Sequence, residues 1–220
     1  DHCQRQRTEG ASGHYHDLQP GGRHGDPALR HEPVCSGTDD KGKPHDNRKS
    51  GTSFHRLLCG GAAAAVDGWT YPLAHFYQSS IYGEGRGYYR HYAVDLAVAE
   101  GNKVFAVANG EVKSVTTSTC GGMVIQILHN AGGTYYRSLY MHLLSNTVKT
   151  GDIVTGGQVI GYSGGGSQEM AKWGDTCTEG AHLHFAMSYG QSAILSSSIA
   201  GSTFNPVKFF PAMSGYGAKL

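Results

Sequence analysis

From residue 68 onward, short apolar segments alternate with glycine-containing turns along the chain. The segments are rich in β-branched and aromatic residues, and none extends into the 3.6-residue periodicity of a long amphipathic helix. They occupy residues 104–108, 110–115, 123–128, 134–141, 158–162 and 182–188. Short strands with frequent turn signals are typical of antiparallel sandwiches and barrel-like sheets. The pattern therefore predicts an all-β fold, built mainly from antiparallel strands, over residues 67–220.

The first 60 residues show almost no apolar periodicity. They hold 17 of the 35 charged residues and seven of the 13 histidines, without a regular metal-binding spacing. Such a segment cannot offset its ordering entropy by burying apolar surface. The apolar run at residues 57–66 ends in small residues, as a secretory signal does before its cleavage site. We expect residues 1–66 to form a poorly structured, propeptide-like extension and residues 67–220 to form the folded domain.

Charge and composition narrow the classes of function. Lys and Arg total 18 against 17 for Asp and Glu, a formal charge of +1. This balance provides no positive field for gripping nucleic acid. No apolar stretch approaches the roughly 20 residues that span a bilayer. Glycine accounts for 33 of 220 residues, about twice its usual share of roughly 7%, which favours tight turns and short strands over a helical bundle.

The sequence His182-Leu183-His184 places two histidines in a predicted strand. Side chains two positions apart leave a strand on the same face, so both imidazoles point into one cleft while Leu183 faces the core. One of them can bind a metal ion while the other handles a proton. This pair is the sharpest chemical signal in the chain.

A second signal is the spacing of His91 and Asp95, four residues apart. Residues at this spacing share a face in either a helix or a strand, so a ring nitrogen and a carboxylate oxygen can converge on one ion. Two histidines and one carboxylate leave an open coordination position, as a catalytic zinc site requires.

A third signal is Tyr140-Met141-His142, in which Tyr140 and His142 are expected to share a strand face. A neutral histidine beside a metal site can orient water or stabilise an oxyanion. Taken singly, a histidine in a strand is more often a hydrogen-bonded structural residue. Four histidines and an aspartate in this arrangement together indicate a hydrolytic metal site.

These motifs lie in a span, from about residue 69 to residue 211, that resembles the lysostaphin-type zinc endopeptidases of bacterial cell walls, a group that includes the beta-lytic proteases. The resemblance covers about two thirds of the chain, and the segments match in order and spacing. They are HYAVD at 91–95, FAVANGEV at 105–112, YMH at 140–142, GDIVTGGQVIGYSG at 151–164, AHLHF at 181–185 and NPVKFF at 205–210.

The resemblance implies one zinc ion held by His91, Asp95 and His184, with His142 and His182 activating water and stabilising the tetrahedral intermediate. It also implies an antiparallel sheet with an open groove, often described as a duplicated hybrid motif. The expected reaction is hydrolysis of peptide bonds next to Gly or D-Ala in peptidoglycan. We expect a monomer that is secreted or held in the cell envelope, with peptidoglycan peptides as its partner, no nucleic acid and no membrane span.

The five cysteines are an odd number, which leaves at least one thiol unpaired. In beta-lytic members cysteines in similar places are paired, so the resemblance implies a disulfide between Cys120 and Cys177. The alternative is two buried free thiols. Cys3, Cys35 and Cys59 lie in the unassigned N-terminal region.

Two aromatic residues are candidates for substrate contact. Trp173 ends the glycine- and serine-rich segment 163–174, which we expect to be a loop bordering the groove. Tyr140 is chosen over its neighbours because it is expected to share a face with His142.

Two other functions compete with peptide hydrolysis. One is a catalytically silent family member that binds cell wall or activates an amidase, although such proteins usually lack one or more ligands. The other is a lipoyl or biotinyl carrier, which the turn at residues 151–161 resembles, but a carrier needs a modifiable lysine at an exposed hairpin tip. The sequence leaves open which bond is cut and whether a propeptide regulates the enzyme.

Overall fold

The longest strand, β8 (Thr134–Asn146), lies at the centre of the fold. It pairs antiparallel with β7 (Gly122–Ala131), β10 (Val159–Ser163) and β11 (His182–Tyr189). The structure, a computed structural model, describes residues 61–194 and 201–220. Its remaining strands are β1 (Tyr77–Ser80), β2 (Glu84–Arg86), β3 (Tyr89–His91), β4 (Val94–Ala97), β5 (Lys103–Phe105), β6 (Gly110–Ser118) and β9 (Ile153–Val154).

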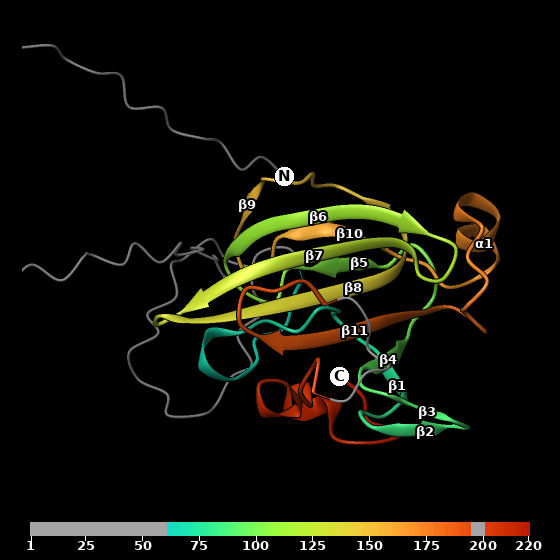
Figure 1. The fold of residues 1–220 in the computed structure, drawn as a ribbon, viewed down its shortest axis with the longest axis horizontal. Helices are drawn as coiled ribbons and strands as arrows, with labels where there is room; N and C mark the ends of the chain where they lie inside the picture. Colours follow the sequence, from blue (N-terminus) through green and yellow to red (C-terminus); the bar gives the residue numbers. More distant parts are fainter. Residues whose placement is uncertain (1–60, 195–200) are drawn as a thin grey trace, which may run out of the picture. The chain divides into compact units, whose positions relative to one another are not determined.

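Within the described residues, nine strands form one antiparallel sheet, and β2 and β3 form a separate hairpin. The sheet runs in the order β1-β4-β11-β8-β7-β6-β9, while β10 bridges β8 and β5. Figure 1 shows β6, β7, β8 and β11 running alongside one another, with the β2–β3 hairpin next to β4. The predicted antiparallel all-β fold is confirmed, and each of the six predicted segments overlaps an observed strand.

A two-glycine turn sets the register of the longest hairpin. Ala131 pairs with Thr134, and the intervening Gly132 and Gly133 both have positive φ, at 62° and 89°. Paired positive φ values give the turn whose twist matches that of the flanking strands. The turn therefore fixes which residues of β7 and β8 face the core.

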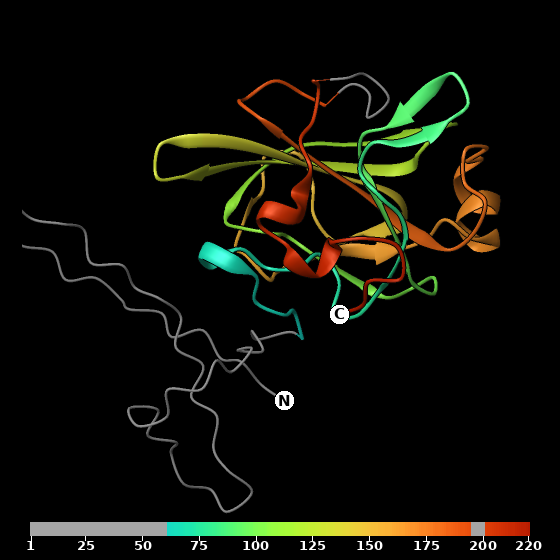
Figure 2. The ribbon, with the colours of Figure 1, turned by 90° about the horizontal axis from the view of Figure 1, so that it is seen from below.

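Side chains of β4, β7, β8 and β11 form much of the hydrophobic core. Leu183, Phe185 and Met187 of β11 are fully buried in it, alternating with histidines at 182 and 184. The C-terminal segment, which contains η2 (Pro206–Lys208) and η3 (Pro211–Met213), packs against the same core. Its Phe210 ring lies 5.7 Å from that of Phe185, and Figure 2 shows this segment in red. Burial of these side chains is the main source of stability for the sheet.

One short α-helix, α1 (Ser167–Trp173), occurs in the described part of the chain, where the sequence predicts a loop. It ends at Gly174, whose φ of 70° is the left-handed conformation typical of a helix C-terminus. Trp173 Nε1 donates to the carbonyl of Leu144 on β8 at 3.1 Å, so the helix is attached to the sheet. No helix in residues 61–194 or 201–220 has the length and apolar character needed to cross a membrane.

The expectations for residues 1–60 lie outside the described residues. The low order predicted for that segment, the domain boundary at residue 67 and the unassigned Cys3, Cys35 and Cys59 remain predictions. Residues 61–66, which were included in the predicted extension, are described: Ala62 is buried, and Ala64 forms a β-bridge with Thr70.

Candidate metal centre

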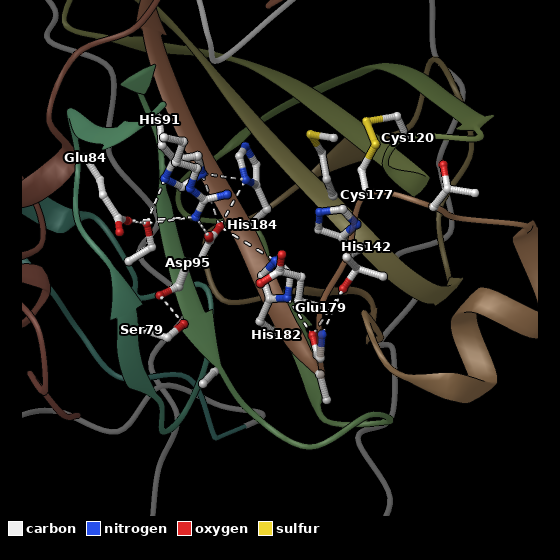
Figure 3. Close-up of a pocket in the computed structure, with 18 of the residues that line it drawn as sticks. Ser79, Glu84, His91, Asp95, Cys120, His142, Cys177, Glu179, His182 and His184 are labelled. Carbon is white, nitrogen blue, oxygen red and sulfur yellow. Dashed lines mark hydrogen bonds and ion pairs between the residues drawn. A yellow bond between two sulfur atoms is a disulfide. The ribbon is translucent and has the colours of Figure 1, made fainter. Parts of the chain in front are cut away.

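Three predicted ligands meet at one point in the sheet. His184 on β11 lies directly opposite Asp95 on β4, and His91 ends β3. His184 Nδ1 lies 3.0 Å from Asp95 Oδ1 and 3.0 Å from His91 Nε2, and the third separation, His91 Nε2 to Asp95 Oδ1, is 3.3 Å. All three residues are buried. Figure 3 shows their polar atoms turned toward one another.

The donor set fits a zinc ion. Two imidazole nitrogens and one carboxylate oxygen are ligands that zinc prefers, and neighbouring ligand atoms of a tetrahedral site lie about 3.3 Å apart. The observed separations of 3.0–3.3 Å match that spacing. Three protein ligands leave a fourth position open, as in catalytic rather than structural zinc sites.

The residues around the ligands fix their orientation. Ser80 Oγ is hydrogen-bonded to His91 Nδ1 at 2.9 Å, which turns His91 Nε2 toward the site. Arg86 donates from Nη2 to Asp95 Oδ2 at 2.7 Å, which leaves Oδ1 facing the histidines. Burial acts to raise the pKa of Asp95, but hydrogen bonds from His184 and His91 hold it well below its ordinary value. Asp95 is therefore an ionised ligand at neutral pH.

His142 and His182 lie beside this site, and their ring centroids are 4.7 Å apart. His142 Nδ1 lies 2.5 Å from Asp175 Oδ2, and His182 Nδ1 lies 2.7 Å from the carbonyl of Gly180. A carboxylate and a carbonyl can only accept, so both Nδ1 atoms carry the proton and both Nε2 atoms are acceptors when the rings are neutral. Burial and the neighbouring His182 lower the pKa of His142 to about 4, so its ring is neutral at neutral pH.

Tyr140, predicted to contact substrate, is not among the residues that line the cleft. Tyr140 is fully buried, and its hydroxyl accepts from Val107 N–H at 3.0 Å. The prediction assumed regular alternation along β8, but His142 has a φ of 60° and the β7–β8 register shifts between Met123 and Ile125. This irregularity turns His142 into the cleft while Tyr140 remains in the core.

The three metal-site residues and the two neighbouring histidines, His142 and His182, line an open cleft of about 880 Å³. Its walls include Arg86 and Tyr89 of the hairpin, Met141 of β8 and Glu179 and Ala181 before β11. Trp173, predicted to contact substrate, is not among the residues that line this cleft. Its indole is held against β8 by the bond to Leu144, so Trp173 anchors α1.

A disulfide joins Cys120 and Cys177, as the resemblance implied. It lies next to Asp175, a site residue that the sequence reasoning missed. Asp175 Oδ1 accepts from the backbone N–H groups of Gly121 and Cys177, at 3.2 Å and 2.9 Å, while Oδ2 holds His142. The disulfide therefore lies next to the backbone N–H groups that hold Asp175, the residue to which His142 is hydrogen-bonded. The available sequence signal was a carboxylate two residues before a cysteine.

Known proteins resemble the chain over the same region. The model of peptidase family M23 matches residues 89–196, which contain all three ligands and both cleft histidines. Glycyl-glycine endopeptidase ALE-1 of Staphylococcus capitis is 33% identical over 129 residues, which are 58% of this chain and 31% of that protein. Lipoprotein NlpD of Yersinia enterocolitica is 30% identical over 118 residues, which are 53% of this chain and 98% of that protein.

A solved structure, the catalytic domain of the antimicrobial peptidase lysostaphin from Staphylococcus simulans, is 28% identical, with 64% of this chain and 93% of that domain covered at a TM-score of 0.49. The chain spans less than a third of the length of ALE-1 and of lysostaphin. Because the family model matches around the site and NlpD is matched almost end to end, this chain belongs to peptidase family M23, with its His91, Asp95 and His184 site intact.

Proposed function

We propose that the β domain, residues 67–220, is a zinc-dependent endopeptidase that hydrolyses peptide bonds in the cross-links of bacterial peptidoglycan. The observation that carries this proposal is the convergence of His91, Asp95 and His184 within 3.3 Å of one another in an open cleft. Zinc bound there supplies a Lewis acid that polarises a carbonyl and lowers the pKa of water.

The chain's own residues supply the proton transfers. His182 Nε2 lies 3.7 Å from Asp95 Oδ1, which puts this acceptor at the edge of the metal centre. His182 donates a hydrogen bond from Nδ1 to the Gly180 carbonyl, so its Nε2 is free to accept a proton from water and to return that proton to the leaving amine. His142, held by Asp175 through its Nδ1 proton, presents the Nε2 acceptor to the same space, where it orients the attacking water by accepting a hydrogen bond.

The substrate class follows from the cleft and from the relatives. Ala97, Gly180 and Ala181 are among the lining residues, so part of the wall offers little side-chain bulk and admits an extended peptide of small residues. The relative from S. capitis is named a glycyl-glycine endopeptidase. We therefore propose bonds next to Gly, with D-Ala-linked stem peptides as the other candidate.

The proposed setting is outside the cytoplasm, secreted or in the cell envelope, because disulfides persist in oxidising compartments. The proposed assembly is a monomer with one zinc ion, since one chain provides all five site residues.

The test incubates the zinc-loaded full chain with purified sacculi, with and without a chelator, and counts new amino termini and reducing sugar ends. We expect chelator-sensitive amino termini and no reducing ends. Asp95→Asn removes a ligand and is expected to be inactive, while Asp67→Asn, an exposed aspartate, is the matched control. Absence of release despite bound zinc would contradict hydrolysis and favour a wall-binding or amidase-activating protein.

A further inference from the structure

Glu169, on α1, is a buried carboxylate with no visible partner. Its relative exposure is 0%, and neither side-chain oxygen has a hydrogen-bond partner among the described residues. An ionised carboxylate in such a place loses its hydration without compensation. A buried acid of this kind either finds a donor or keeps its proton.

The neighbourhood of Glu169 is formed by two glycines and a second carboxylate. A Cβ placed on Gly122 would lie 1.5 Å from Glu169 Oε1 and 3.2 Å from Asp175 Oδ2, so both carboxylates lie against the same Cα. A Cβ on Gly164 would lie 2.6 Å from Glu169 Cγ. The absence of side chains at these two glycines therefore gives Glu169 its place beside Asp175.

Asp175 accepts hydrogen bonds from three donors, whereas no donor among the described residues reaches the Glu169 carboxylate. Asp175 accepts hydrogen bonds from His142 Nδ1 at 2.5 Å and from two backbone N–H groups. The acidic groups that face Glu169 are Asp175, from the segment after α1, and Glu100, from the segment after β4. Burial, with the charges of Asp175 and Glu100, raises the pKa of Glu169 to about 7. Of the two facing carboxylates, Glu169 is thus the one that carries a proton.

We propose that Glu169 is a positioning residue whose protonated carboxyl donates a hydrogen bond to Asp175. The donated bond fixes the Asp175 carboxylate, and Asp175 in turn fixes the tautomer and direction of the His142 ring. Glu169 reaches the chemistry only through Asp175. The effect on turnover rests on the proposed function, since it requires His142 to act in hydrolysis.

The first test reads the proton directly in the full chain without metal. Infrared difference spectra between the wild type and Glu169→Gln are expected to contain the C=O stretch of a protonated carboxylic acid at pH 6. That band should titrate away as the pH rises through about 7. Absence of the band at pH 6 would overturn the proposal. The outcome does not depend on peptidase activity, so it is distinct from failure of the proposed function.

The second test separates positioning from packing. Glu169→Gln keeps a neutral donor and is expected to retain the wild-type kcat within about twofold, whereas Glu169→Leu removes the donor. Loss of a hydrogen bond to a charged group predicts a kcat about tenfold lower or more for Glu169→Leu, with KM unchanged. The downfield proton resonance of His142 Nδ1 should shift in the leucine variant and not in the glutamine variant.

The matched control is Glu111→Gln, a partly exposed carboxylate on β6 that pairs with Lys113. It should leave kcat, the pH profile and the His142 resonance unchanged. A leucine variant with wild-type kcat and an unshifted resonance would refute the positioning role. If Glu169→Leu does not fold, the infrared band and the pH profile decide: wild type should lose activity as Glu169 ionises above pH 7, and Glu169→Gln should not.

Discussion

Removal of the Cys120–Cys177 disulfide provides a measurable test of how the cleft is held together. The double variant Cys120→Ala, Cys177→Ala opens a crosslink between residues 57 positions apart. In the chain-entropy model, a loop of this length stabilises the folded state by about 4 kcal/mol. Both cysteines are exposed, so alanine at these positions leaves no core cavity to add to the cost. The expected loss is therefore about 4 kcal/mol in the free energy of unfolding.

The assay is equilibrium unfolding in urea, followed by the fluorescence of the buried Trp69. The slope is fitted for each protein, because the crosslink also restricts the unfolded chain. Thr119→Ala, an exposed neighbour whose side chain is replaced without touching the crosslink, is the control and should match the wild type. A loss below about 1 kcal/mol for the double variant would refute the loop-entropy reasoning.

Three further outcomes are expected. Asp95→Asn should lower the zinc content from one ion per chain to none by elemental analysis, and stoichiometric zinc would contradict its role as a ligand. Burial lowers the pKa of His129 to about 4, so the folded state excludes a proton that the unfolded chain binds near pH 6.5. Stability should then fall by about 3 kcal/mol between pH 6.5 and pH 4. Denaturation curves of His129→Gln should show a smaller fall, and an equal one would exclude His129 as the cause. Gly122→Ala should lower the free energy of unfolding more than Gly132→Ala does. Both glycines have positive φ, but only a side chain at Gly122 would collide with Glu169. The Gly132 change should cost about 1–2 kcal/mol, as measured by urea unfolding, and equal costs would contradict the contact with Glu169.

Short-range patterns were sufficient to predict six segments that overlap observed strands, and they marked the histidines and the aspartate of the site as candidates. Alternation with period two in His182-Leu183-His184 predicts that Leu183 is buried and that both histidines line the cleft, as observed. Turn residues at Gly132 and Gly133 mark the hairpin in the same local way.

The same alternation failed for Tyr140, because a residue with φ of 60° interrupts β8 at His142. A non-glycine residue in that conformation has no reliable sequence signature. Helix α1 was also missed, because a segment of only seven residues between two glycines is typical of a loop. The bond that attaches the helix to the sheet, from Trp173 to the Leu144 carbonyl, joins residues far apart in sequence.

By itself, the sequence determined the all-β fold and, through its resemblance to a known family, the His91, Asp95 and His184 ligands and the cysteine pairing. Only the tertiary structure decided that Asp175 holds His142 and that Glu169 is buried beside Asp175. The physical reason is how far apart in sequence the contacting residues lie. Strand periodicity and ligand spacing are set by neighbours in the chain, whereas Glu169 and Asp175 meet over Gly122, about 50 residues away in sequence, through long-range packing.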